Sequence, residues 1–84
     1  IQIMSKIEKD LKHIFKIIFK LKDGSMEKAT FNNVKKWDSM NHLNLILTIE
    51  STFKIRVEPE ESINFLTYKH ILKYLKSVLK HKSS

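Results

Sequence analysis

The sequence predicts an all-α fold, a small four-helix bundle with three longer helices, one short helix and a long first loop. Three observations favour this fold class. Glycine and proline, which usually mark turns, occur once each in 84 residues. Apolar residues recur at spacings of three and four along residues 3–21 and 68–79, as in amphipathic helices. With 42% hydrophobic residues, a chain of this length can bury one modest core, so we expect a single domain over residues 1–84.

The first predicted helix covers residues 3–21. Lysines alternate with its apolar residues so that, at about 100° per residue, the two kinds fall on opposite faces. The apolar face consists of Ile3, Ile7, Leu11, Ile14, Ile18 and Leu21. Gly24 can adopt the left-handed conformation of a helix C-cap, so we expect this segment to end there.

Residues 25–36 show no clear periodicity and form the predicted first loop. Asn32 and Asn33 indicate a turn within it. Four apolar residues are expected to hold the loop against the core, namely Met26, Phe31, Val34 and Trp37. A loop of this length is uncommon in so small a domain and is usually functional.

The second predicted helix covers residues 39–53. Asp38 and Ser39 stand immediately before an apolar helical pattern, which is an N-cap signature. The apolar residues of this segment cover more than half of the helix circumference. The polar stripe that remains consists of Asn41, Asn44, Thr48 and Ser51. A helix that apolar is either deeply buried or presents apolar surface to a partner.

A short extended connection over residues 54–58 precedes a short third helix. Pro59 suits the first position of a helix and two glutamates follow it at the positive end, so we expect this helix to reach about residue 66. Thr67 is expected to cap the fourth helix. The core predicted from the apolar stripes contains Leu11, Ile14, Ile18, Leu43, Ile46, Leu47, Phe53, Ile71 and Leu75.

The order of these elements around the tripeptide Asp38-Ser39-Met40 resembles that of acyl carrier proteins, whose Asp-Ser-Leu site carries a prosthetic group. Residues 50–61 look like the second-helix end, connecting loop and short third helix of that family. Residues 67–75 resemble the start of its last helix. Everything before Trp37 matches the family in pattern only. The resemblance therefore implies an acyl-carrier-like four-helix bundle.

The resemblance also implies that Ser39 carries a covalent 4'-phosphopantetheine, whose sulfur holds acyl or aminoacyl groups as thioesters. A phosphodiester there would lie at a helix N-terminus, which favours an anion. By the same resemblance Asp38 helps the modifying transferase to recognise the site. The implied protein is a non-catalytic carrier, with a phosphopantetheinyl transferase and acyl-loading and acyl-transfer enzymes as partners. The residues expected to contact these partners are Met40, Asn41, Asn44, Leu45 and Thr48.

The sequence departs from this family in its charges. Acyl carrier proteins are typically acidic along the helix after the modified serine, but this helix carries one acid, Glu50. Met40 replaces the usual leucine, and Lys69-His70 stands where the family often has glycine and an acid. These differences favour a carrier dedicated to a specialised pathway over the housekeeping carrier of fatty-acid synthesis. We expect its partners to recognise it through uncharged contacts more than through long-range electrostatic steering.

Residue types and spacings oppose catalytic and metal sites. The chain has no cysteine, which excludes thiolate chemistry and cysteine-ligated zinc. Asp38, Ser39 and His42 lie too close together in sequence to form a hydrolase triad, in which one group orients another from behind. The four histidines show no metal-ligand spacing. We therefore expect neither an enzyme nor a metal site, and we expect His42 on solvated helix surface.

The net charge of +7 supports an alternative function. Lysines follow the outer faces of the first and last predicted helices, and such faces are usually only solvated. They could instead bind nucleic acid or an anionic membrane surface. Arg56 is the only arginine, which opposes phosphate recognition. The leading interpretation is a cytoplasmic monomer that binds no nucleic acid and has no stable membrane insertion, since lysines interrupt its apolar runs.

Overall fold

The computed structural model describes residues 2–22 and 24–82, with side chains described from residue 5 to residue 80. These residues form four α-helices and no strand, and 67% of them are helical. The helices are α1 (Gln2–Phe19), α2 (Ser39–Phe53), α3 (Pro59–Ser62) and α4 (Tyr68–Lys82), with a short 3₁₀ helix, η1 (Met26–Lys28), in the first loop. The predicted all-α class is therefore confirmed.

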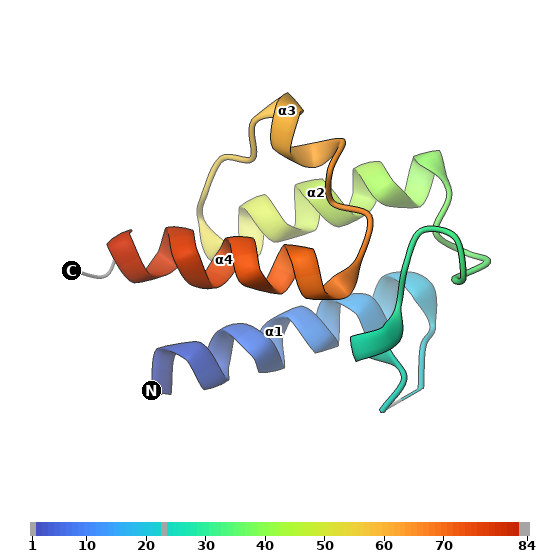
Figure 1. Ribbon diagram of the computed structural model, residues 1–84, viewed down its shortest axis with the longest axis horizontal. Helices are drawn as coiled ribbons and strands as arrows, with labels where there is room; N and C mark the ends of the chain where they lie inside the picture. The colour runs from blue at the N-terminus through green and yellow to red at the C-terminus, as the bar shows by residue number, and fades with distance from the viewer. Residues whose placement is uncertain (1, 23, 83–84) are drawn as a thin grey trace.

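The three long helices surround one core. In Figure 1, α1 runs in the opposite direction to α2 and α4, and α3 lies at the edge of the bundle beside α2. Contacts join α1 to both other long helices, and η1 packs against α1 and α4. Buried apolar side chains from the three long helices, from η1 and from the connecting segments form a single cluster, to which α3 contributes no buried residue.

Helix α2 faces the core through a different part of its circumference than the sequence predicts. Other predicted core residues are buried or partly buried in the core cluster, namely Leu11, Ile14, Ile18, Ile46, Phe53, Ile71 and Leu75. The prediction is wrong for Leu43 and Leu47, which are 57% and 54% exposed. Their places are taken by Leu45 and Ile49, both fully buried. Because apolar residues surround most of α2, their periodicity does not decide which of them meets α1.

Phe15 lies at the centre of an aromatic cluster that joins α1, the first loop and α4. Its ring packs edge-to-face against the rings of Phe19, Trp37 and Tyr68, at centroid distances of 5.2–5.4 Å. Burial raises the pKa of the Tyr68 hydroxyl well above its usual range, with smaller contributions from two glutamates. The cluster fixes Trp37, which is 2% exposed, only two residues before Ser39.

The first loop is attached to the start of α4. An isolated antiparallel bridge joins Thr30 to Thr67, and the Phe31 N–H donates to the Leu66 carbonyl at 2.8 Å. Among the residues predicted to hold the loop, Met26, Val34 and Trp37 are buried and Phe31 is partly exposed. The loop is therefore an ordered part of the fold, pinned at its middle and at its end.

The helix ends follow local backbone rules, with two differences from the prediction. Helix α2 starts and stops where expected, and the Thr67 hydroxyl oxygen caps α4 by accepting from the His70 N–H at 3.0 Å. Helix α1 ends earlier than expected because Lys20, with φ of 57°, already adopts the left-handed conformation. Helix α3 ends at Ser62 instead of residue 66, and turns connect it to α4.

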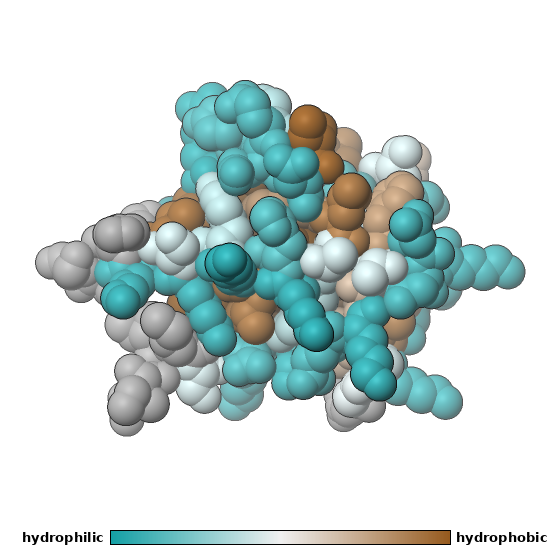
Figure 2. All heavy atoms as spheres, in the orientation of Figure 1, coloured by the Kyte–Doolittle hydropathy of each residue, from teal (hydrophilic) through white to brown (hydrophobic). Residues whose placement is uncertain are grey.

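The surface formed by α1 and α4 is strongly hydrophilic. Figure 2 shows polar side chains over most of this face and apolar side chains gathered beside α3. Some lysines pair with carboxylates: Lys6 with Asp10 at 3.7 Å, and Lys12 with Glu8 at 4.0 Å and Glu27 at 3.8 Å. No helix within the described residues is long and apolar enough to cross a membrane.

Candidate functional site

Ser39 is the first residue of α2, and its surroundings leave its hydroxyl accessible. Asp38 is the N-cap: its Oδ1 accepts from the Asn41 N–H at 2.9 Å, as predicted. Asp38, Ser39 and Met40 are all exposed. Within the described part of the chain, no hydrogen bond uses the Ser39 hydroxyl. An exposed, unengaged hydroxyl therefore stands at the positive end of a 15-residue helix.

Beside Ser39, the side chains of the predicted polar stripe form hydrogen bonds with one another and with nearby backbone carbonyls. The Asn41 amide donates to the Lys36 carbonyl at 2.8 Å, which ties the end of the first loop to α2. Asn41 also accepts from the Asn44 amide at 3.1 Å, and the Thr48 hydroxyl donates to the Asn44 carbonyl at 2.7 Å. Asn44 is exposed, whereas Asn41 and Thr48 are half-buried. This stripe is therefore uncharged and stiffened by local bonds.

An apolar strip runs along α2 next to the polar stripe. It consists of Met40, Leu43 and Leu47, which lie within roughly 60° of one another around the helix and are 75%, 57% and 54% exposed. Leu45, predicted to contact partners, is fully buried, so that prediction is wrong. Its position on the helix turns it toward the core, and Leu43 and Leu47 occupy the surface instead. Ile63, just after α3, is also 68% exposed.

His42, expected on solvated surface, instead links three segments. The Trp37 indole N–H donates to His42 Nδ1 at 3.0 Å, and His42 Nε2 lies 2.8 Å from the Ser62 carbonyl oxygen. The Trp37 and His42 rings are nearly parallel, with an interplanar angle of 21°. The ring of Phe31 stands edge-on to His42 at 6.4 Å. His42 therefore connects the end of the first loop, the first turn of α2 and the end of α3.

These bonds bear on any chemistry of Ser39. Both ring nitrogens of His42 are engaged, by Trp37 and by Ser62, so neither faces the Ser39 hydroxyl. A general base must reach the hydroxyl whose proton it takes. Asp38 is likewise occupied at Oδ1 by the helix cap. The three residues lie close together without forming the relay that a hydrolase requires.

Charges around the site are sparse. Glu50, the only acid of α2, accepts from the Val57 N–H at 2.8 Å and so holds the connection that leads to α3. Lys35 and Lys36 are exposed just before Trp37. Apart from Glu50, which is half-buried and bonded to the Val57 N–H, the surface of α2 carries no acid, lysine or arginine. Contacts there do not require the desolvation of an ion, which is costly.

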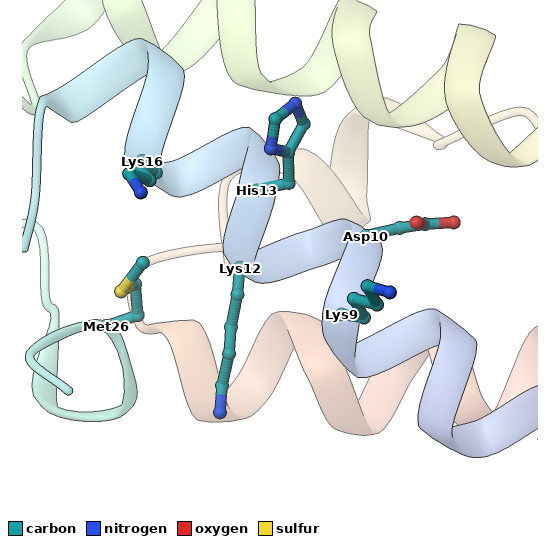
Figure 3. A pocket seen from close by; sticks show the side chains of 6 residues that line it. All are labelled: Lys9, Asp10, Lys12, His13, Lys16 and Met26. Carbon is teal, nitrogen blue, oxygen red and sulfur yellow. The ribbon is translucent and has the colours of Figure 1, made fainter. Parts of the chain in front are cut away.

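Surface depressions among the described residues lie away from Ser39. One depression of about 460 Å³ lies at the junction of α1 and α2, and its lining includes Ile14, Ile17, Ile18, Thr48 and Thr52. Another of about 310 Å³ lies along α1 beside Met26, and Figure 3 shows its lysines pointing in different directions instead of converging. Among the described residues, no group of three His, Asp or Glu side chains could hold a metal ion.

The link made by His42 was missed in the sequence because its hydrogen-bond partners come from two other segments, the first loop and the end of α3. Trp37 and His42 are five residues apart, and Trp37 precedes the N-cap of α2. Helical periodicity therefore does not predict that their side chains meet. Nothing in the residues around Ser62 identifies its carbonyl as an acceptor. The only signal was a lone histidine one turn after the candidate serine.

Comparison with models of known protein families and with curated proteins gives no match. The function is therefore inferred from the chemistry of the chain's own residues. The strongest of these is the accessible hydroxyl of Ser39 at the start of α2, set between a pinned loop and an uncharged helix surface.

Proposed function

We propose that this chain is a carrier protein in which Ser39 bears a covalent 4'-phosphopantetheine. The thiol of that group would hold acyl or aminoacyl intermediates as thioesters, which is why the chain itself needs no cysteine. One observation carries the proposal: the Ser39 hydroxyl is exposed and makes no hydrogen bond in the described chain, at the N-terminus of a long helix. The all-α architecture and the pinned loop before Ser39 support it.

The residues around Ser39 fit a phosphodiester. The first backbone N–H groups of α2 and its dipole favour a negative group, by about 0.3–1 kcal/mol at an exposed site. The Asp38 cap holds the helix start in place through Asn41. Lys35 and Lys36 add positive charge on the loop side. A phosphate attached to Ser39 would thus be stabilised without being buried.

The partners would bind the surface of α2. The apolar strip of Met40, Leu43 and Leu47 can lose water on contact, and Asn44 offers hydrogen bonds beside it. The proposed partners are a phosphopantetheinyl transferase and enzymes that load and receive acyl groups. The absence of charge on this surface fits partners of a specialised pathway more than those that dock on acidic carriers. The chain would act as a cytoplasmic monomer and not as an enzyme.

The decisive experiment is modification of the purified protein by coenzyme A and a broad-specificity phosphopantetheinyl transferase. Intact mass should rise by one phosphopantetheine. Ser39→Ala should abolish the addition while leaving the circular dichroism spectrum unchanged. Ser51→Ala, which changes an exposed serine late in the same helix, is the matched control and should be modified normally. Addition that persists in Ser39→Ala, or a folded wild-type protein that gains no mass beside a modified reference carrier, would refute the proposal.

The basic faces of α1 and α4 support a second candidate, binding of nucleic acid or an anionic membrane. Lys69 and Lys73 are exposed, and α4 carries no acid. Against this, Lys6 and Lys12 are paired with carboxylates on α1 and η1. Phosphate-binding surfaces lose affinity steeply with salt. Salt-dependent binding of an oligonucleotide or an anionic vesicle that is lost in Lys73→Glu would favour this second function.

A further inference from the structure

The contacts of His42 determine where its proton lies. The indole N–H of Trp37 can only donate, so His42 Nδ1 must accept and carry no hydrogen. The Ser62 carbonyl can only accept, so His42 Nε2 must carry the hydrogen. Only the neutral imidazole protonated at Nε2 makes both bonds. The structure thus selects one of the two neutral tautomers and excludes the imidazolium.

Protonation of His42 breaks one of these bonds by chemistry alone. A proton taken from solvent at Nδ1 turns the acceptor for Trp37 into a donor, so two N–H groups face each other. Trp37 is 2% exposed, and its buried donor would have no acceptor in its place. The arrangement is therefore stable only while His42 is neutral.

Charged groups of both signs lie on the elements that meet at His42. Asp38 is the N-cap of α2, and Glu58, Glu60 and Glu61 lie on or next to α3. Lys35 and Lys36 stand at the end of the first loop. Protonation of His42 acts through the hydrogen-bond pattern at Nδ1.

We infer that Trp37, His42 and Ser62 form a proton-operated latch: when His42 is neutral its Nδ1 accepts from Trp37, and protonation breaks this bond while the Nε2–H bond to the Ser62 carbonyl remains. The Ser62 carbonyl also accepts from the Phe65 N–H at 3.2 Å, a backbone bond that holds the turn leading to α4. Opening leaves the Trp37 indole N–H without its acceptor, two residues before Ser39. The latch is a property of the unmodified chain and does not depend on the proposed carrier function.

Trp37 is the only tryptophan, so its fluorescence reports the latch directly. Between pH 7.5 and pH 5, the range in which histidines titrate, its emission should change with a single midpoint. Exchange of the indole N–H with solvent should accelerate roughly tenfold after correction for its intrinsic pH dependence, because its acceptor is lost. The helical circular dichroism should stay constant over the same range.

Two substitutions test the two hydrogen bonds of His42 one at a time. In His42→Asn the amide oxygen can replace Nδ1 as the acceptor for Trp37. In His42→Gln the amide nitrogen can replace Nε2 as the donor to Ser62. Neither amide titrates, so both variants should lose the pH-dependent change in Trp37 emission. His42→Asn should keep the Trp37 indole proton protected, whereas His42→Gln should expose it. His13→Gln, which removes an exposed histidine on α1, should leave the transition unchanged.

The nitrogen-15 shifts of His42 in the wild-type protein give a test that needs no variant. At pH 7.5 they should show a hydrogen on Nε2 and none on Nδ1, and the opposite tautomer would overturn the latch. A Trp37 transition that survives in His42→Gln, or no transition at all in the wild type, would also overturn it. So would loss of the helical signal with the same midpoint, because protonation would then unfold the domain instead of opening one contact.

Discussion

Helices α1 and α2 pack against each other but show solvent different surfaces. The outer face of α1 carries lysines, among them Lys6 and Lys12, which pair with nearby carboxylates. The outer face of α2 carries no lysine and includes an apolar strip beside a polar stripe. Stripping water from an ion costs far more than stripping it from a methyl group. This difference makes the outer face of α2, the helix that begins at Ser39, the better surface for transient contacts with a partner. The outer face of α1 is better suited to remain in contact with water.

The largest expected effect separates two leucines of α2. Leu45→Ala removes a fully buried side chain and should lower the free energy of unfolding by about 2–5 kcal/mol. Leu47→Ala truncates a side chain that is 54% exposed and should cost about 0.5 kcal/mol or less, as surface substitutions do. Urea denaturation of both variants measures the two values. Equal losses of unfolding free energy in the two variants would mean that α2 buries a different face than described. The outer face of α2 would then not be the apolar surface that distinguishes it from α1.

The second effect concerns binding to the transferase. Met40→Asp places a charge on the apolar strip and should lower kcat/KM for modification by about tenfold or more, because an unpaired carboxylate would have to be desolvated. Lys12→Glu, on the outer face of α1, should change it little. Salt should have a small effect on the wild-type rate. If Lys12→Glu were the more damaging variant, the basic face would be the contact surface.

The start of α2 provides the third test. Asp38→Ala removes the N-cap and should destabilise the protein by about 1 kcal/mol. Asp38→Asn keeps an oxygen that can accept from the Asn41 N–H, so its melting temperature should stay close to that of the wild type. Any further loss of modification rate in Asp38→Asn would then report recognition of the carboxylate itself. Equal destabilisation by Ala and Asn would contradict the capping role.

The smallest effect lies at the helix C-termini. Lys54, the C-cap of α2, has φ of 56°. Lys20, which follows the last residue of α1, has φ of 57°. Glycine adopts this conformation without steric cost, so Lys54→Gly should stabilise the protein by about 0.5–1 kcal/mol. Lys20→Gly should act in the same direction. Thermal melts measure both changes, and destabilisation by both would show that the lysine side chains contribute more than their backbone strain costs.

The sequence predicted the elements of this fold better than it predicted their orientation. The Asp38 cap and the Thr67 cap gave the starts of α2 and α4, because capping is a local interaction. In α1, alternation of apolar residues and lysines was enough to identify the buried face. In α2 it was not, since Leu43, Leu45 and Leu47 are equivalent by composition. Which of them is buried is decided by the packing of α2 against α1.

The candidate site was predicted in the same uneven way. Ser39 and its cap lie within one turn of helix, so the sequence contains all of their geometry. The environment of His42 depends on Trp37 and on the carbonyl of Ser62, which reach it from separate segments. A backbone carbonyl leaves no trace in the amino-acid sequence. Tertiary links of this kind become visible only once the chain is folded.

The bridge between Thr30 and Thr67 has a consequence for the order of folding. It joins residues that lie far apart in the chain, and closing such a loop costs entropy before its contacts can compensate. The middle of the first loop therefore reaches its final form only after the start of α4 has docked. By the same argument, the middle of the first loop should open by local fluctuation more readily than the helices. The free energy of this opening should be lower than the free energy of global unfolding. The approach to Ser39 would then fluctuate on a faster timescale than the helices that support it.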